Sequence, residues 1–311
     1  MSSTSSSVVL GLSARMPPHI IEPFVCSLRA TSYKGRIALI VAQYGPEELR
    51  RIRRMVDDVM VVDGEYEAPP RFSVTAIRSG RRFAASSGYD KLFTLATGMR
   101  GERAARSCWR SLEYRFQGLQ SLRYGHYYDY LTKHAPHAEQ VLLTDVRDVF
   151  FQDDPFSVPL TGLEVFLEDP SHRLASERHN AGWIADLYGH EALTMLGDYV
   201  VSCSGTVAGD RSSILHYLKE MIEATAWRRR PMGARDQGVH NYLLRTGRFP
   251  DAKVVDNGGG RVMTMDGMRA FSENNGGQIQ NSDGTIPAVV HQYDRHQELA
   301  DRVTSLFSFP K

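Results

Sequence analysis

The stretch VLLTDVRDVFFQDDPF, at positions 141–156, begins with apolar residues and then reaches two acids, Asp145 and Asp148, with Arg147 between them. The apolar run predicts a buried β-strand. In an open parallel α/β sheet, ligands bind beyond the carboxyl ends of the strands, which is where Asp145 would lie. Two interpretations stay open: a divalent-metal site, or a solvated strand end whose acids cap a helix or pair with Arg147.

The end of the same stretch has a different character. Asp153 and Asp154 stand in QDDP, directly before Pro155. Acids followed by proline are typical of a turn. We therefore expect these two acids to shape the chain rather than bind a ligand.

On the N-terminal side of this stretch, apolar runs alternate with amphipathic segments. We predict strands at 8–14, 36–44 and 59–63, with helices at 20–31 and 46–58 between them. Such alternation with short links indicates a parallel sheet with crossover helices. The segment 64–105 is basic and rich in Gly and Ser, and it suits either a loop over a ligand or a plain surface excursion.

Further elements are predicted around and after the opening stretch. Helices are expected at 110–134, at 211–227 with Ser212 as a cap, and at 235–247, where Gly247 ends the helix. Strands are expected at 163–169, at 199–210 with a break at Gly205, and from 287 into a final helix ending near 303, while 256–285 is mostly turns. The fold class is therefore α/β, with a mixed, mostly parallel, Rossmann-like sheet flanked by helices in a single large domain. Residues 1–7 are expected to form a disordered tail.

Composition narrows the class of protein. The chain has 311 residues, 37 basic against 36 acidic, and 42% of them are hydrophobic. This is a globular composition, and its charge balance argues against general nucleic-acid binding. The N-terminus MSSTSSS lacks the features of a secretory signal, the three cysteines form no CxxC pair, and no apolar run approaches the ~18 residues of a membrane span. We expect a cytoplasmic protein without a membrane span, and a homodimer stays open.

Four short motifs follow one another in a characteristic order. They are VLLTDVRDVFF, VVSCSGTVAGDRSSILHYL, RDQGVHNYLL and VVHQYDRH. In order and spacing they resemble the metal-binding strand end, the small-residue turn, the Asp-Gln helix start and the late histidine strand of retaining nucleotide-sugar glycosyltransferases with the GT-A fold. The resemblance covers most of the chain, from about residue 8 to residue 300. It implies a nucleotide-sugar-binding half at 8–155 and an acceptor-binding and catalytic half at 156–311.

The resemblance implies a divalent ion, Mg²⁺ or Mn²⁺, held by Asp145, Asp148 and His291. Carboxylates suit these hard cations, which neutralise a leaving diphosphate. The family's Asp-x-Asp signature would place an acid at 147, and this chain has Arg147 there. Three versions stay open: Asp148 is the second ligand, only Asp145 and His291 bind the ion directly, or Arg147 supplies the positive charge instead.

The resemblance also implies roles for the helix start at 236. Asp236 would hold the hydroxyls of the donor sugar and Gln237 would lie near the anomeric carbon. From the residues alone, the preferred role of Asp236 is to cap its helix, and this role is compatible with the sugar contact. Gly205 would let the backbone approach the sugar, since glycine has no side chain. The full set of expected donor contacts is Leu12, Ser13, Arg15, Arg115, Thr144, Arg147, Gly205 and Arg295.

The function that this resemblance implies is transfer of a hexose from a nucleotide sugar, GDP-mannose or a UDP-hexose, to a carbohydrate or glycoside acceptor, with retention. Two other classes remain open. One is a metal-dependent phosphohydrolase, although DVRDVFF lacks the Gly-Thr that usually follows in such enzymes. The other is a non-catalytic nucleotide-sugar binder.

Overall fold

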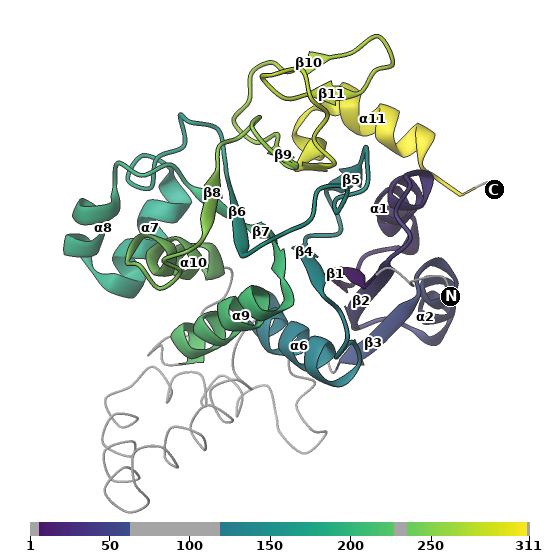
Figure 1. Ribbon diagram of the computed structural model, residues 1–311, viewed down its shortest axis with the longest axis horizontal. Coiled ribbons are helices and arrows are strands. Elements are labelled where there is room, and N and C mark those ends of the chain that lie inside the picture. The colour runs from purple at the N-terminus through teal and green to yellow at the C-terminus, as the bar shows by residue number, and fades with distance from the viewer. Residues whose placement is uncertain (1–5, 63–118, 227–234, 310–311) are drawn as a thin grey trace, which may run out of the picture.

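A computed structural model describes residues 6–62, 119–226 and 235–309 (Figure 1). The predictions for most of the N-terminal tail, for the segment 64–105, for Arg115 and for the start of the 110–134 helix lie outside these residues. No helix in the described ranges is both long enough and apolar enough to cross a membrane.

The N-terminal part alternates strands and helices as predicted. Its elements are β1 (Ser7–Ala14), α1 (Pro18–Ala30), β2 (Arg36–Ala42), α2 (Pro46–Met55) and β3 (Asp58–Val62). The three strands pair in parallel, with Leu10 opposite Ala38 and Ala38 opposite Asp58. Proline opens both helices, where its missing N–H costs no intrahelical hydrogen bond.

The sheet then grows on the other side of β1. The elements that build this side are α6 (Leu119–Lys133), β4 (Gln140–Thr144), β6 (Leu163–Leu167), α7 (Arg178–Tyr188), α8 (His190–Leu196), β7 (Ser202–Asp210), α9 (Arg211–Ala226), α10 (Asp236–Arg245) and β8 (Lys253–Val255). The strand order is β3-β2-β1-β4-β7-β6-β8. Only β7 runs against its neighbours, β4 and β6, and the other pairs are parallel. The mixed, mostly parallel sheet is confirmed, and strands from both predicted halves share it.

A smaller sheet, which the sequence analysis did not predict, lies beside the large one. It consists of β5 (Val149–Phe151), β12 (Val289–His291) and β9 (Val262–Thr264), with β12 in the middle. The short strands β10 (Ser272–Glu273) and β11 (Ile279–Gln280) form a separate pair in the region predicted to be turns. The chain then forms a 3₁₀ turn, η1 (Tyr293–Arg295), and α11 (Gln297–Leu306).

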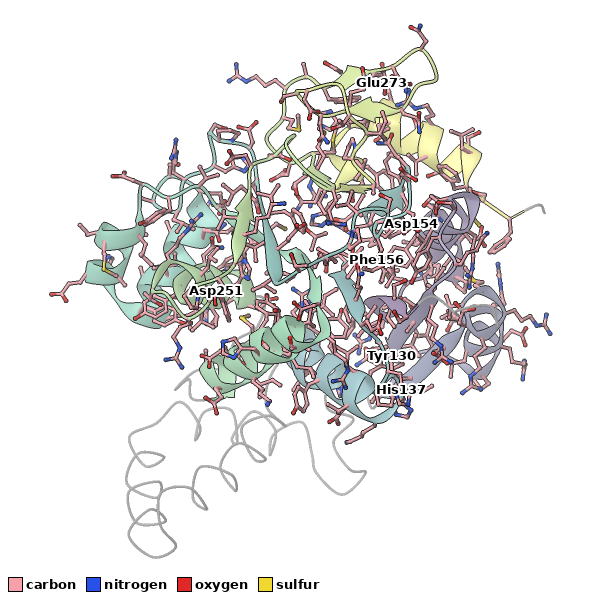
Figure 2. All side chains as sticks on the ribbon, in the orientation of Figure 1. Tyr130, His137, Asp154, Phe156, Asp251 and Glu273 are labelled. Atoms are coloured by element: carbon pink, nitrogen blue, oxygen red, sulfur yellow. The ribbon has the colours of Figure 1, made fainter. Side chains whose placement is uncertain are left out.

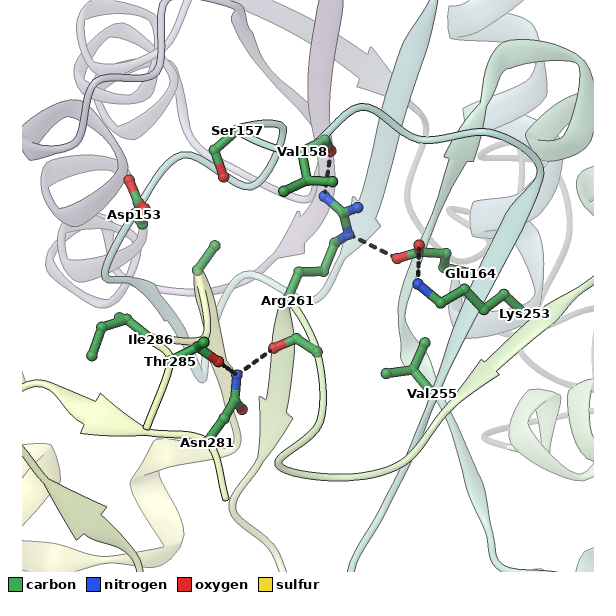
Figure 3. A pocket seen from close by; sticks show the side chains of 12 residues that line it. Asp153, Ser157, Val158, Glu164, Lys253, Val255, Arg261, Asn281, Thr285 and Ile286 are labelled. Atoms are coloured by element: carbon green, nitrogen blue, oxygen red, sulfur yellow. Dashed lines mark hydrogen bonds and ion pairs between the residues drawn. The ribbon is translucent and has the colours of Figure 1, made fainter. Parts of the chain in front are cut away.

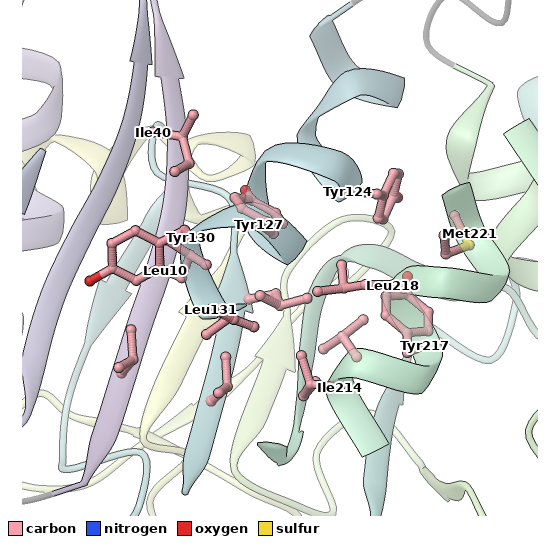
Figure 4. Close-up of a cluster of buried hydrophobic side chains, with 14 of the residues drawn as sticks. Leu10, Ile40, Tyr124, Tyr127, Tyr130, Leu131, Ile214, Tyr217, Leu218 and Met221 are labelled. Atoms are coloured by element: carbon pink, nitrogen blue, oxygen red, sulfur yellow. The ribbon is translucent and has the colours of Figure 1, made fainter. Parts of the chain in front are cut away.

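The large sheet is covered on both faces. Helices α6, α9 and α10 cover one face, where Tyr124, Tyr127 and Tyr217 pack on strand residues such as Leu10 and Ile40 (Figure 4). The other face packs against α1, α2 and the small sheet. Because both faces are buried, the central strands are continuous apolar runs, as in 141–143.

Two local predictions are wrong. Strand β7 continues through Gly205, from Ser202 to Asp210, although its pairing with β6 shifts register between Val207 and Ser202. Ser212 is not the cap of α9, because Asp210 accepts hydrogen bonds from the Ser213 amide at 2.9 Å and from the Ser212 hydroxyl at 2.6 Å. The carboxylate therefore stabilises the start of that helix.

The turn after β5 agrees with its prediction. Asp153 accepts a hydrogen bond from the amide of Asp154, and Asp154 accepts one from the amide of Phe156, at 2.7 and 2.8 Å (Figure 2). Both carboxylates are therefore used by the local backbone.

Candidate functional site

The candidate site lies where β4 ends. Asp145 follows the last residue of that strand, and its amide donates to the carbonyl of Gly205 on β7 at 2.7 Å. Strand β5 follows soon after, and it pairs with β12, with Val149 opposite His291. The small sheet thus brings a histidine from near the end of the chain to the two acids of the opening stretch.

Asp145, Asp148 and His291 form a cluster that we call the metal cluster. The His291 Nε2 atom lies 3.5 Å from one oxygen of Asp145 and 3.8 Å from one oxygen of Asp148. These separations are too long for good hydrogen bonds. His291 is fully buried, and among the described residues none hydrogen-bonds its Nε2. An orphaned imidazole nitrogen facing two carboxylates is a donor set that fits Mn²⁺ or Mg²⁺.

The carboxylates and the imidazole of the metal cluster shift each other's pKa values. Burial tends to raise the pKa of Asp145, but Arg123 and His291 outweigh it and lower that pKa to about 2. The pKa of His291 is raised, because Cys203, Asp145 and Asp148 outweigh the effect of burial. Without a cation the carboxylates therefore favour a proton on the imidazole, and a metal ion would compete with that proton.

Arg147 lies on the outer side of the metal cluster. It donates to one oxygen of Asp148 at 3.0 Å and approaches Asp294 at 3.4 Å, while its own side chain is 53% exposed. The other oxygen of Asp148 faces His291. Arg147 thus neutralises the outer oxygen and leaves the inner oxygen of Asp148 for a ligand.

A second arginine, which the sequence analysis did not single out, lies beneath the site. Arg123 of α6 is buried and donates to Asp145 at 2.8 Å and to Asp236 at 2.7 Å. It also donates to the carbonyl of Ser204 at 3.1 Å. Arg123 donates to Oδ1 of Asp145, whereas the Oδ2 atom of the same carboxylate faces His291. One guanidinium therefore connects the metal cluster to the start of α10.

Gly205 has a steric role that the sequence analysis did not predict. A Cβ built on it would lie 2.5 Å from Asp145 Oδ2 and 2.8 Å from His291 Cε1. Any side chain here would displace two members of the metal cluster. The glycine is thus explained by the cluster, and its predicted contact with a sugar stays a prediction.

Asp236 and Gln237 both face the site, but their polar groups are already engaged. Asp236 is the first residue of α10 and not its cap, and its carboxylate accepts from Arg123 and from the Tyr124 hydroxyl. Gln237 accepts from the Ser204 amide at 3.3 Å and donates to Glu168 at 3.0 Å. The structure thus brings both predicted catalytic residues beside the metal cluster, and their catalytic roles stay predictions.

Four of the predicted donor contacts lie on β1, just after it, or at the end of β4, and they differ in how exposed they are. Ser13 is fully buried within β1 and its hydroxyl pairs with Tyr44 at 2.5 Å, so it is not open to a ligand as expected. Leu12 also lies within β1, whereas Arg15, directly after that strand, is exposed and has a φ of 53°. Thr144 is buried and its hydroxyl donates to the Asp145 carbonyl at 3.0 Å, beside the metal cluster.

Arg295 lies on the same rim as Arg147. It pairs with Asp294 at 2.7 Å and with Asp266 at 3.6 Å, and its side chain is 41% exposed. The two arginines therefore share Asp294 as a partner. Both remain exposed enough to meet an anionic ligand.

Glu168 is a further buried acid at this edge of the sheet. It follows the end of β6, the strand on the far side of β7 from β4. Its carboxylate is only 5% exposed and contacts the Nδ1 atom of His172 at 3.2 Å. Burial raises the pKa of Glu168, with Asp266 contributing in the same direction.

The sequence contained signals for the two missed residues. Arg123 falls within the helix predicted at 110–134. It stands among Leu122, Tyr124 and Tyr127, and a charged residue within an apolar stripe usually has a buried partner. Glu168, like Asp145, is an acid directly after an apolar run.

A cavity of about 290 Å³ lies elsewhere, beside the beginning of β6 (Figure 3). The two cations of its lining, Arg261 and Lys253, both pair with Glu164, at 2.8 and 3.1 Å. None of Asp145, Asp148 and His291 lines it, so the cavity is separate from the metal cluster. It contributes nothing to the candidate site.

Comparison with known proteins adds no family to these observations. The chain matches no family model, and a search of curated proteins finds no match.

Proposed function

We propose that this chain is a glycosyltransferase that depends on a divalent cation. It would move a hexose from a nucleotide sugar, GDP-mannose or a UDP-hexose, to a carbohydrate or glycoside acceptor, with retention. The observation that carries the proposal is the convergence of Asp145, Asp148 and an orphaned His291 nitrogen at the carboxyl edge of a mostly parallel sheet. The motif resemblance to GT-A enzymes supplies the reaction class.

The residues of the metal cluster would hold Mg²⁺ or Mn²⁺. When bound, the ion stabilises the negative charge that develops on a leaving diphosphate. Arg147 and Arg295, on the exposed rim, would bind diphosphate oxygens, because a guanidinium presents a planar set of donors to them. Both arginines contact Asp294, so a diphosphate would take the place of a carboxylate that they already share.

Asp236 and Gln237 would face the sugar. Arg123 holds Asp236 in a fixed orientation, and Glu168 and the Ser204 amide fix the amide of Gln237. Groups held in this way can orient a sugar without losing further conformational freedom. We therefore assign these two residues to the sugar and Asp145 to the metal ion.

The experiment is a nucleotide-sugar panel with Mn²⁺ or Mg²⁺, read by release of nucleoside diphosphate and by thermal shift. Asp145→Ala should abolish metal-dependent release while the variant stays folded. The matched control is Asp153→Ala, since Asp153 belongs to the same stretch but serves only the turn. This control should keep full activity.

The other outcomes identify the alternatives. If no donor gives release or a thermal shift, the proposal fails. Donor binding without turnover indicates a non-catalytic binder, and release of phosphate from simple phosphate esters indicates a phosphohydrolase. Retention is tested by NMR of the product, and a β-linked product from an α-linked donor would contradict it.

A further inference from the structure

We propose that Glu168, His172 and Asp266 bind a second divalent cation, distinct from the ion of the metal cluster. This inference goes beyond the proposed function, since it concerns cation binding and not the transfer reaction. The three residues, which we call the second cluster, come from the end of β6, from the chain between β6 and α7, and from the loop after β9. One ligand atom of each residue lies within 4.8 Å of the other two.

The first observation is that the ligand atoms of the second cluster face one another. The Nδ1 atom of His172 lies 3.2 Å from Oε2 of Glu168 and 4.0 Å from Oδ2 of Asp266. The other oxygen of each acid is held from outside the cluster. Gln237 donates to Oε1 of Glu168 at 3.0 Å, and Nε of Arg295 lies 3.6 Å from Oδ1 of Asp266. Each acid therefore keeps one inward oxygen for a ligand.

The metal cluster is divided in the same way. Asp145 gives Oδ1 to Arg123 and turns Oδ2 toward His291. Asp148 gives Oδ2 to Arg147 and turns Oδ1 toward the same ring. The separations from the imidazole nitrogen are 3.5 and 3.8 Å there, close to those of the second cluster. One imidazole nitrogen with two carboxylate oxygens is a donor set that suits Mn²⁺ or Zn²⁺.

The second observation is a buried negative charge without a matching positive charge. The described residues include five buried acids: Glu22, Asp148, Glu164, Glu168 and Asp236. Four of them have an arginine at 2.7 to 3.4 Å. Glu168 has no Arg or Lys partner in the described part of the chain, although its side chain is only 5% exposed. Burying a carboxylate without a cation is costly, and a divalent ion at its inward oxygen would supply the missing charge.

The third observation is that the spacing fits an ion. Two ligand atoms that each lie about 2.1 Å from an ion are roughly 3.0 Å apart at right angles and roughly 3.4 Å apart at the tetrahedral angle. The separation of 3.2 Å between His172 and Glu168 falls between these values. The separation of 4.0 Å to Asp266 exceeds the tetrahedral value by about 0.6 Å, which a loop side chain that is 41% exposed covers by a small rotation.

Gly267 fixes the direction of the imidazole. It has a φ of +79°, and a Cβ built on it would lie 2.6 Å from both Nε2 and Cε1 of His172. The glycine backbone therefore packs against that edge of the ring, and Nδ1 is the nitrogen that meets the two acids. An ion at Nδ1 takes the place of the proton that Nδ1 shares with Glu168, so binding releases a proton.

A second ion would join two parts of the fold. Glu168 follows β6 of the large sheet, whereas Asp266 follows β9 of the small sheet. Through its other oxygen Glu168 also holds the side chain of Gln237. The ion would therefore act as a structural cross-link between the two sheets and would stabilise the folded chain.

The test counts Mn²⁺ ions on the chelator-stripped full chain by equilibrium dialysis at pH 7. Wild type should bind two ions per chain, one at each cluster. Asp145→Ala and His172→Gln should each retain one ion, and the variant with both substitutions should retain none. His137→Gln is the matched control and should bind two, because His137 is an exposed histidine beyond the opposite end of β4 from Asp145 (Figure 2).

A thermal measurement makes the test independent of counting. In Asp145→Ala only the second cluster is intact, so Mn²⁺ at a hundredfold excess over its Kd should raise the Tm by about 4 °C for a chain of this length. The same Mn²⁺ should leave the Tm of the double variant unchanged. If His172→Gln does not fold, Asp266→Asn takes its place, since that side chain is half-exposed on a loop, and it should also lose the second ion.

Two results overturn the inference. One is a wild-type count of one ion that Asp145→Ala abolishes, and the other is a count of two ions that neither His172→Gln nor Asp266→Asn reduces. The failure of the proposed function gives a different result. A second ion that is lost only in variants of the second cluster supports the inference even if no nucleotide sugar is turned over. Turnover that depends on Asp145, in a protein that binds a single ion, supports the proposed function and contradicts the inference.

Discussion

Arg123→Met tests the charge balance beneath the site. In the wild-type protein Arg123 is the cation between two carboxylates, Asp145 at 2.8 Å and Asp236 at 2.7 Å. The Asp236 side chain is only 8% exposed. Without Arg123, its carboxylate would retain one described side-chain partner, the Tyr124 hydroxyl at 2.9 Å. Removing one partner of a buried ion pair costs about 3–5 kcal/mol. Asp145 adds little to this cost because its side chain is 39% exposed.

The cost converts to a measurable change in Tm. For 311 residues, an unfolding entropy of about 2.1 cal/mol/K per residue means that each kcal/mol lowers Tm by ~1.5 °C. Arg123→Met should therefore unfold about 5–8 °C below wild type, by circular dichroism at pH 7 with a chelator present. Arg50→Met is the matched control, because Arg50 is a helical arginine whose ion pair with Glu47 is mostly exposed. It should change Tm by less than ~1 °C.

The same variant makes a prediction about pH. Asp145 has a folded pKa of about 2 against a reference of 3.8, with Arg123 as the largest cause of the lowering. A depressed acid pKa gives stability that is present above pH ~4 and lost as the pH falls toward 2. Arg123→Met should therefore lose less stability than wild type between pH 4 and pH 3.

A double substitution separates charge from packing. Adding Asp236→Asn to Arg123→Met removes the unpaired charge, so the double variant should be at least ~1 kcal/mol more stable than the sum of the single effects. If Arg123→Met unfolds within 1.5 °C of wild type, the guanidinium is not the partner that Asp236 requires and the reasoning is refuted.

Three further substitutions test other contacts. Gly205→Ala should destabilise the folded protein by about 1–3 kcal/mol and weaken Mn²⁺ binding, because its Cβ would lie 2.5 Å from a carboxylate oxygen of the metal cluster. The control is Gly182→Ala on an exposed helix face, where a Cβ meets nothing within 4 Å, and it should stabilise the protein by roughly 0.4–1 kcal/mol. Equal effects of the two substitutions would contradict this explanation. Cys203→Ala removes the sulfur 3.6 Å from the ring of the cluster histidine, and calorimetry should show Mn²⁺ affinity lower by about tenfold, whereas Cys26→Ala should leave it unchanged. Asp210→Ala should cost about 0.5–2 kcal/mol in urea at pH 7, since it removes the cap of α9. Local hydrogen bonds outweigh burial and lower the pKa of Asp210 to about 2. The difference in unfolding free energy between wild type and Asp210→Ala should therefore be complete above pH ~4 and decrease toward pH 2. A difference that does not change with pH would argue against the charged cap.

The alternation of strands and helices was predictable because its signals are local. Runs such as 36–42 and the proline-opened helix at 46 carry their periodicity within a few residues. The same is true of Asp145, whose position at a strand end can be read from the apolar run before it. The nearness of Asp148 and His291 to Asp145 was predicted from resemblance, and the structure brings the three side chains together.

What the sequence could not indicate depends on pairing between distant segments. Strand β7 is predicted from its sequence as a strand, but nothing local shows that it runs antiparallel to β4 and β6. The partners of Arg123 lie 22 and 113 residues away, so its role appears only in the folded chain. Gly205 was interpreted as a strand break for the same reason, because the groups that require glycine there come from other strands.

The central position of β12 in the small sheet has a consequence for synthesis of the chain on the ribosome. Both acids of the metal cluster emerge early, but their histidine belongs to a strand that begins only at Val289. Until that strand emerges, β5 has no partner in its sheet and Phe150 and Phe151 cannot be buried against it. Pairing across such a long separation is slow. Cation binding should therefore be among the last properties that the nascent chain acquires, and ribosome-bound chains stalled before residue 289 should bind no Mn²⁺ at this cluster.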